Sequence, residues 1–315
     1  MKRTTTILML ALAGGLVAAN AQTWNPPTEA ARCPSKWGAG DELGSGNHMG
    51  SDSVLRATRL IQQGEVVDLG HVLHAGMPLG NRHFDLYPKP TFMNPQSNRR
   101  GSNEELVVTE LGQVGTQFDG FAHQTIGNTL YNCIPLDETL TRSGFTRLGV
   151  QNVGTLMTRA VLLDIAKLKG VEILPADYEI TIEDLQQALE DANLTVEPGD
   201  AVIINTGWGQ LWTRDVERFL GPAPGIGVAA AEWLATLEPM IVGSDNQPVE
   251  IQPNPDPEVS LPIHQIMLVV NGIHILERLN LEELAAREVY EFALVVQPLK
   301  IQGATGSTVA PSAMY

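Results

Sequence analysis

Three side chains between residues 113 and 123 have the types and spacing of a metal site. Gln117 and Asp119 are two positions apart, so on an extended strand they point to the same face. His123 follows after a bend at Gly120 and can return to the same point. Oxygen and imidazole ligands suit a divalent ion such as zinc or manganese. The stretch predicts a metal centre; a polar strand end with one structural histidine is the competing interpretation.

Alternating strands and helices must position this stretch. Two nearly continuous apolar runs, 160–165 and 201–205, are typical of strands buried on both faces. Thr181 is a suitable N-cap for a helix with Leu185 and Leu189 on its apolar side. Further strands are expected at 65–69, 240–243 and 291–296, a helix at 228–237, and a short helix capped by Asn280 with Glu283. We predict a single α/β domain with a mixed β-sheet flanked by helices.

Other segments leave alternatives open. Residues 264–270 and 273–276 fit strands or one long bent element. Residues 76–104 are polar and rich in Gly, Pro and Asn, which predicts a long loop, and such loops are often functional. The polar cluster 245–247 at a strand end is interpreted either as part of a site or as a loop cap.

The first 21 residues are predicted to be a secretory signal peptide. Lys2 and Arg3 precede a short apolar run from Ile7 to Ala18, and the small residues Ala19 and Ala21 precede the expected cleavage point. The run is too short to span a bilayer comfortably, so a membrane anchor is the less favoured interpretation. We therefore expect a periplasmic or secreted protein, with an N-terminal arm at 22–64 and the main domain at 65–315.

Composition limits the partners. The whole chain has a net charge of −16, and removal of Lys2 and Arg3 with the signal segment makes it −18. A chain this acidic repels nucleic acid and anionic membrane surfaces, so neither is expected as a partner. Two cysteines remain, Cys33 and Cys133, which either pair in an oxidising compartment or stay separate buried thiols.

The stretch 113–123 resembles the signature of the metal-dependent cyclase family, which includes bacterial kynurenine formamidases and isatin hydrolases. That signature reads His-x-Gly-Thr-His-x-Asp-x-Pro-x-His. Gln113 and Gln117 stand where its first two histidines would be, and Phe121 stands in place of the proline. Segments resembling the family's other motifs cover most of residues 36–308. The signature positions that match are Gly115, Thr116, Asp119 and His123.

The resemblance implies a kynurenine formamidase-like swivelling β/β/α fold and a site with one or two divalent metal ions, zinc or manganese. By position, the candidate ligands are Gln117, Asp119, His123, His264 and Glu277. Losing two imidazoles weakens a zinc site, because an amide oxygen is a harder donor. A single ion held without the glutamines, with Gln113 and Gln117 positioning substrate or water, is one outcome. A site that no longer binds metal is the other.

The implied chemistry is hydrolysis by metal-activated water, with His123, His264 or Glu277 moving the proton and His264 preferred. Gln113, Phe118 and Trp208 are candidate substrate contacts, although both rings would also suit core packing. The expected substrate is a small cyclic or aryl-linked amide, formamide or lactone. Arylformamidase activity, as in tryptophan breakdown to kynurenine, is the best-known activity in the family, but export disfavours it.

The competing class is a secreted small-molecule binding protein built on a degenerate enzyme site. The two glutamines, Gln113 and Gln117, keep that alternative open. Relatives form dimers or tetramers, so the resemblance also implies a homo-oligomer.

Overall fold

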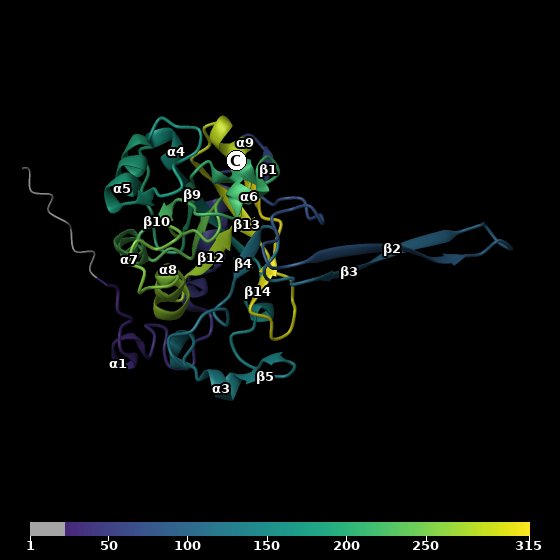
Figure 1. The fold of residues 1–315 in the computed structure, drawn as a ribbon, viewed down its shortest axis with the longest axis horizontal. Helices are drawn as coiled ribbons and strands as arrows, with labels where there is room; N and C mark the ends of the chain where they lie inside the picture. The colour runs from purple at the N-terminus through teal and green to yellow at the C-terminus, as the bar shows by residue number, and fades with distance from the viewer. Residues whose placement is uncertain (1–22) are drawn as a thin grey trace, which may run out of the picture.

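A nine-stranded mixed sheet organises the chain in the computed structural model, which describes residues 23–315 (Figure 1). The predicted signal segment lies outside the described residues. The central strands β7, β9, β11 and β12 run parallel, and the outer strands pair antiparallel. The predicted single α/β domain is confirmed. The strands, in spatial order, are β1 (Val66–Asp68), β15 (Ser312–Met314), β13 (Glu291–Val296), β7 (Leu156–Asp164), β9 (Ala201–Asn205), β11 (Ile241–Ser244), β12 (His274–Glu277), β4 (Gln117–Asp119) and β14 (Gly306–Thr308).

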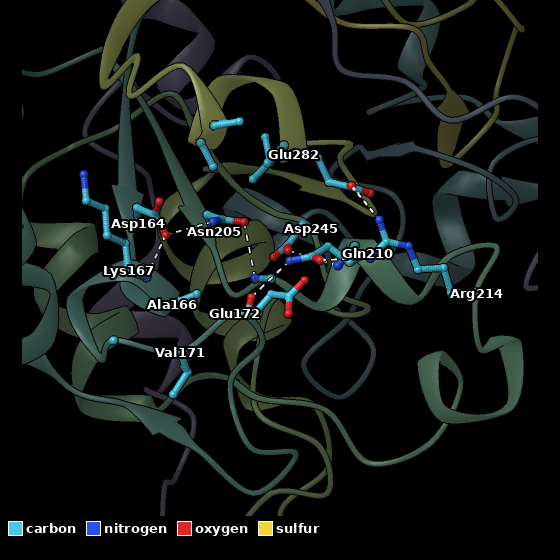
Figure 2. Close-up of a pocket in the computed structure, with 16 residues that line it drawn as sticks. Asp164, Ala166, Lys167, Val171, Glu172, Asn205, Gln210, Arg214, Asp245 and Glu282 are labelled. Carbon is cyan, nitrogen blue, oxygen red and sulfur yellow. Dashed lines mark hydrogen bonds and ion pairs between the residues drawn. The ribbon is translucent and has the colours of Figure 1, made fainter.

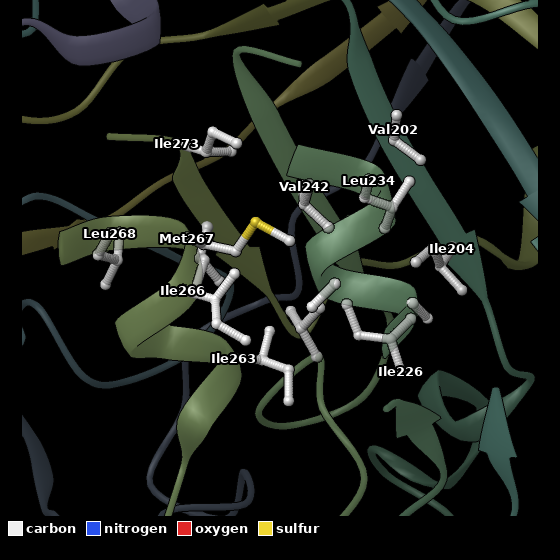
Figure 3. Close-up of a cluster of buried hydrophobic side chains, with 14 of the residues drawn as sticks. Val202, Ile204, Ile226, Leu234, Val242, Ile263, Ile266, Met267, Leu268 and Ile273 are labelled. Carbon is white, nitrogen blue, oxygen red and sulfur yellow. The ribbon is translucent and has the colours of Figure 1, made fainter. Parts of the chain in front are cut away.

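Both faces of the central strands are covered, which explains their continuous apolar sequences. Alternate residues of a strand point to opposite faces. Val161 and Leu163 of β7 therefore belong to one core and Leu162 to another. The first core is closed by α5 (Ile182–Asp191), α7 (Val228–Thr236) and the apolar side of residues 263–268, as Figure 3 shows around Met267. On the other face, α2 (Ser51–Thr58) packs against β7 and β13.

The predicted helices at 182–192 and 228–237 are confirmed, and Thr181 caps α5 in a capping box with Asp184. Of the alternatives for 264–276, a strand is confirmed only at 273–276, which forms β12. A strand at 264–270 is wrong: α8 (Pro262–His264) continues into a π-helical segment, η5 (Gln265–Asn271). A short apolar run does not distinguish a buried helix from a buried strand, because both faces are hidden. The Asn280 cap is also wrong. The helix α9 (Glu282–Ala286) has no side-chain cap, and the Asn280 backbone N–H donates to Leu69 instead.

The loop predicted at 76–104 is wrong from residue 84 onward, where the chain forms a long hairpin of β2 (Phe84–Met93) and β3 (Gly101–Thr109). This hairpin projects from the body of the molecule in Figure 1. The sequence did not predict this hairpin because β2 contains Pro88 and Pro90, and proline within a run of residues usually argues against a strand.

The N-terminal segment packs on the domain and carries regular structure before residue 65. It contains α1 (Glu29–Arg32), η1 (Gly44–His48) and α2. Cys33 and Cys133 form a disulfide, which ties this segment to the turn at η2 (Tyr131–Cys133). No described helix is long and apolar enough to cross a membrane. The smaller elements are η3 (Val150–Asn152), α3 (Leu136–Thr139), β5 (Leu140–Thr141), β6 (Gly144–Phe145), α4 (Ile165–Leu168), β8 (Glu179–Ile180), η4 (Trp208–Leu211), α6 (Val216–Phe219) and β10 (Gly225–Ile226).

Candidate metal centre

Pairing between β4 and β12 brings early and late acidic residues together. The two strands are antiparallel, with Gln117 opposite Glu277 and Asp119 opposite Ile275. Side chains opposite one another or two apart along a strand share a face. Gln117, Asp119 and Glu277 therefore project from the same face of the sheet, and all three are buried.

Two histidines complete the cluster from outside the sheet. His264 comes from α8, and its Nε2 lies 3.8 Å from Asp119 Oδ2 and 3.1 Å from Glu277 Oε1. His123 comes from the turn after β4, and its Nε2 lies 4.0 Å from the same Asp119 oxygen. One ligand atom each from Asp119, His123 and His264 lies within 4.8 Å of the others. The structure thus gathers all five predicted ligands, including Gln117, whose Nε2 donates to Asp119 Oδ1 over 3.3 Å.

The residues present fit a divalent cation. Asp119 Oδ2 and Gln117 Oε1 are buried without a hydrogen-bond partner. An unpartnered buried carboxylate oxygen is costly, and a bound cation removes that cost. Ligand atoms around one ion lie about 2.0–2.3 Å from it, hence at most about 4.6 Å apart, close to the separations found here. Carboxylate, imidazole and amide oxygen donors are all metal ligands.

The cluster is electrostatically coupled. Burial raises the pKa of Asp119 against the opposing charge of His123, and Glu277 adds to the rise. Burial also acts to raise the pKa of Glu277, but the hydrogen bond and charge of His264 bring it below its ordinary value. Burial alone would lower the pKa of His264, whereas Glu250 and Glu277 together raise it well above the ordinary value. The two carboxylates therefore favour the protonated form of His264.

Glu250 is a site residue that the sequence reasoning missed. It is fully buried, and its Oε1 lies 2.6 Å from His264 Nδ1. Its carboxylate also accepts the backbone N–H groups of Ile263 and His264. A carboxylate bound to the outer nitrogen of a histidine fixes that ring for metal ligation through the other nitrogen. The available signal was a charge alternating with apolar Val249 and Ile251.

Arg278 is a second missed residue. It is only 6% exposed, directly follows Glu277, and donates from a guanidinium nitrogen to the Gln113 carbonyl over 3.2 Å. Burial lowers the pKa of Arg278, while the charges of Glu277 and Asp119 oppose this fall. Its positive charge therefore offsets part of the negative charge of the cluster. Gln113 itself lies at the margin, partly buried, with its side-chain nitrogen unpartnered.

The two aromatic candidates for substrate contact are fully buried. Phe118 points to the opposite face of β4 from Asp119 and packs against His274, with ring centroids 4.6 Å apart. Trp208 packs in a separate core with Phe219, whose carbonyl accepts its indole N–H over 3.2 Å. Neither ring offers a surface to a substrate, so the core-packing interpretation holds for both.

A separate cavity lies at the carboxyl ends of β7, β9 and β11. It has a volume of about 660 Å³, and Figure 2 shows Asp164, Asn205 and Asp245 among its lining residues. Its polar groups satisfy one another: Asn205 donates to Asp164 over 2.8 Å, and Asp245 accepts the Gly209 N–H over 3.0 Å. Asp245 thus serves as a loop cap, as one interpretation predicted. With no unpartnered buried atom among its lining residues, this cavity is the weaker candidate.

Comparisons with known proteins agree with this geometry. The model of the family described as "Putative cyclase" matches residues 67–251. A solved structure described as a novel cyclase is 32% identical and covers 92% of this chain and 99% of its own, with a TM-score of 0.83. The chain therefore belongs to the cyclase family, as its sequence signature implied.

More distant structures share the fold. An isatin hydrolase bound to the product analogue thioisatinate is 22% identical, covering 84% of this chain and 98% of its own, with a TM-score of 0.59. Isatin hydrolase A from Labrenzia aggregata, bound to benzyl benzoate, is 19% identical, covering 79% and 93%, with the same TM-score. The comparison with curated proteins gives no match.

Glu250→Gln is predicted to weaken metal binding about 10- to 100-fold, the usual effect of losing a carboxylate behind a metal-ligating histidine. The amide has one acceptor oxygen, so it can accept the backbone N–H of Ile263 or that of His264 but not both, and the melting temperature should fall together with the affinity. Titration of the metal-free protein with Mn²⁺ or Zn²⁺ measures the affinity. The matched control is Glu258→Gln, which changes an exposed carboxylate. Unchanged affinity in Glu250→Gln would remove Glu250 from the site.

Proposed function

We propose that the protein is a metal-dependent hydrolase of a small molecule whose carbonyl carbon is bonded to nitrogen or oxygen. The observation that carries this proposal is the Asp119 carboxylate, which is buried with an unpartnered oxygen between His123 and His264. Family membership supports it, and so do the names of several fold neighbours, which are hydrolases.

Asp119 and His264 would hold the ion, with Glu277 and Gln117 Oε1 as further oxygen donors. His123, the third group whose ligand atom lies within 4.8 Å of the others, is assigned to proton transfer instead. Zinc or manganese suits this set, and the amide oxygen favours manganese. A bound divalent ion would lower the pKa of water and polarise a substrate carbonyl. Glu250 holds the His264 ring in place through Nδ1, and Arg278 offsets the negative charge of the carboxylates.

The proton is best carried by His123. Its side chain retains 20% exposure, while that of His264 retains only 3%. Both nitrogens of His264 already contact carboxylates, so that ring has no free atom for a leaving group. We therefore move the role of proton carrier from His264 to His123 Nε2, which is the imidazole accessible from outside the cluster.

The substrate class follows from the neighbours' names and from the predicted export. Isatin is a cyclic amide, so a cyclic amide or a lactone fits better than N-formylkynurenine, which is usually made inside cells. The arylformamidase reaction remains the second choice within this class. We place the mature protein in the periplasm or the medium.

One observation favours a different function, a small-molecule binding protein on a degenerate site. His264 lies between Glu250 and Glu277, and Gln117 donates to Asp119, so the polar groups partly satisfy one another without a cation. Such an arrangement would bind substrate-like molecules without turning them over.

Metal analysis combined with a substrate panel distinguishes the two functions. We expect about one Mn²⁺ or Zn²⁺ per chain, and hydrolysis of at least one of isatin, dihydrocoumarin and N-formylkynurenine. Chelation should abolish turnover and the same ion should restore it. A chain that binds neither ion and leaves all three compounds intact would be a binding protein.

A further inference from the structure

A smaller cavity lies between the N-terminal segment and the rest of the domain. It has a volume of about 260 Å³, and none of the five candidate metal ligands lines it. Its walls come from α1, η1 and η2, together with the ends of α7 and η5. Pockets for drug-sized ligands measure about 300–1,000 Å³, so this cavity accommodates a molecule of about one ring. The lining residues that matter here are Arg32, Lys36, Trp37, His48, Tyr131 and Glu238.

Arg32 is a buried cation without an anion bound to it. It is only 7% exposed, and its Nη2 donates to Thr129 Oγ1. Its Nε and Nη1 are buried and have no hydrogen-bond partner among residues 23–315. Burial lowers the pKa of Arg32 below its ordinary value, and the charge of exposed Glu29 offsets only part of this fall. The guanidinium therefore has two N–H groups left for an acceptor.

Arg159 shows how this chain pairs a buried guanidinium. It is also 7% exposed, but it forms ion pairs with Asp200 and Glu291. A buried charge without a partner is strongly unfavourable, so buried charges in proteins are normally paired. Within the described part of the chain, Arg32 has no ion pair of this kind. The comparison indicates that the missing partner of Arg32 is an anion from outside the chain.

The charges around the cavity favour an anion with a single charge. Lys36 Nζ lies 2.6 Å from Glu238 Oε1, so these two charges offset each other. Burial and the charge of Lys36 lower the pKa of His48 against the charge of Glu238, which keeps the ring neutral near pH 7. Arg32 is then the unbalanced charge among the lining residues. A carboxylate neutralises it, whereas a phosphate dianion would add negative charge beside Glu238.

The walls of the cavity suit a flat apolar body. Trp37 and Tyr131 line it, and Trp37 packs edge-on against His48 with ring centroids 5.1 Å apart. His48 Nε2 is buried without a hydrogen-bond partner and supplies a second polar atom. Ligand sites typically combine apolar and aromatic walls with a few polar groups that fix the orientation. Arginine is well suited to bind a carboxylate, because its N–H groups form charge-assisted hydrogen bonds.

We propose that this cavity binds a small monocarboxylate with an apolar body of about one ring, and that its carboxylate pairs with the Arg32 guanidinium. No residue of the metal centre takes part, so the site is independent of the proposed hydrolysis. Arg32 and Trp37 belong to the N-terminal segment, whereas Tyr131 belongs to the domain. The bound ligand therefore holds the segment on the domain.

Titration calorimetry of the purified protein with benzoate tests the site. Benzoate should bind and should raise the melting temperature, because a ligand that binds only the folded state stabilises it. Arg32→Met should weaken binding at least about tenfold, since it removes the charged donor at similar side-chain length. Arg59→Met is the matched control, because Arg59 is exposed, and it should keep the wild-type affinity.

A carboxylate can also bind a metal ion, so the titrations are repeated in an Asp119→Asn background. Benzoate binding that depends on Arg32 should persist there, whatever the outcome for metal and turnover. Benzamide has the shape of benzoate without its charge and should bind at least about tenfold more weakly. Inorganic phosphate should also bind more weakly than benzoate.

Two measurements separate ligand binding from a folding role of Arg32. Arg32→Lys keeps the charge and should bind benzoate with an affinity between those of the wild type and Arg32→Met. Unliganded Arg32→Met should melt at or above the wild-type temperature, because a buried unpaired charge is removed. Thr129 Oγ1 still donates to the Ile126 carbonyl in that variant.

Equal benzoate affinity in the wild type and Arg32→Met would overturn the proposal, and so would equal affinity for benzoate and benzamide. Tighter binding of phosphate would contradict the assignment to a monocarboxylate. Failure of the wild type to bind benzoate, together with a lower molar mass in Arg32→Met, would assign the guanidinium to a carboxylate of a second copy and reject the ligand site.

Discussion

Asp119→Asn is expected to abolish metal binding and hydrolysis while leaving the metal-free fold at least as stable as the wild type. Loss of the carboxylate removes the central ligand of the cluster, so turnover should fall by at least about a thousandfold, equivalent to about 4 kcal/mol of transition-state stabilisation. The metal-free variant gains folding stability relative to the metal-free wild type. Burial raises the pKa of Asp119, so its ionised form destabilises the folded state near neutral pH. The amide removes that buried charge.

Three measurements test this prediction: metal content, turnover, and the melting temperature after chelation. Asp245→Asn is a matched control, because Asp245 is another fully buried aspartate whose pKa is raised by burial. Asp245 accepts hydrogen bonds from Thr206 and Gly209, so its replacement should lower the melting temperature and leave the metal content intact. If Asp119→Asn kept both its metal and its turnover, the centre would have to lie elsewhere.

Replacing Cys33 and Cys133 with serine is expected to cost up to about 4.7 kcal/mol of unfolding free energy at 25 °C. The cysteines are 100 positions apart, and the chain-entropy model assigns about this value to a closed loop of that length. The observed loss should fall within the usual range of about 2–5 kcal/mol. The N-terminal segment should be the first part to detach, because the disulfide is a cross-link that fixes it to the domain in addition to the chain itself.

Guanidinium unfolding of the double variant and of the wild type measures this difference. Reduced wild-type protein should match the variant, and the variant should not respond to the reductant. Hydrogen exchange should increase most in residues 23–50. Equal unfolding midpoints for the oxidised wild type and the variant would show that the bond contributes nothing to stability.

The strands at the centre of the sheet could be predicted because runs of consecutive apolar residues indicate strands that are buried on both faces. Residues 160–163 of β7 and 201–204 of β9 are uninterrupted apolar runs, and α5 begins at a capping box. The prediction of a strand at 264–270 was wrong because this apolar run is a buried helix. When all sides of a segment are buried, the spacing of apolar residues does not distinguish a helix from a strand. The hairpin of β2 and β3 was not predicted because Pro88 and Pro90 are compatible with a loop as well as with an edge strand.

The residues of the candidate metal centre were proposed from the sequence for a different reason. Asp119 and His123 share one short stretch whose spacing is visible, whereas His264 and Glu277 entered only through the family resemblance. Glu250 was not predicted because it lies in none of the motifs that carried the resemblance, and its contact is with His264 rather than with the ion. Phe118 and Trp208 were assigned to a pocket by type alone, and their types are equally common in cores.

The amino-acid sequence by itself determined the alternation of buried strands and amphipathic helices, the family, and the oxygen and imidazole donors around residue 119. These depend on spacings of a few residues, which the backbone geometry of a strand or turn converts directly into shared faces. Only the tertiary structure showed that β4 pairs with β12, that Glu250 binds the Nδ1 atom of His264, and that β2 and β3 form a separate two-stranded sheet. Those contacts form between segments that are far apart in the chain and are buried against one another. The spacing of residues within one segment does not indicate which distant segment it will pack against.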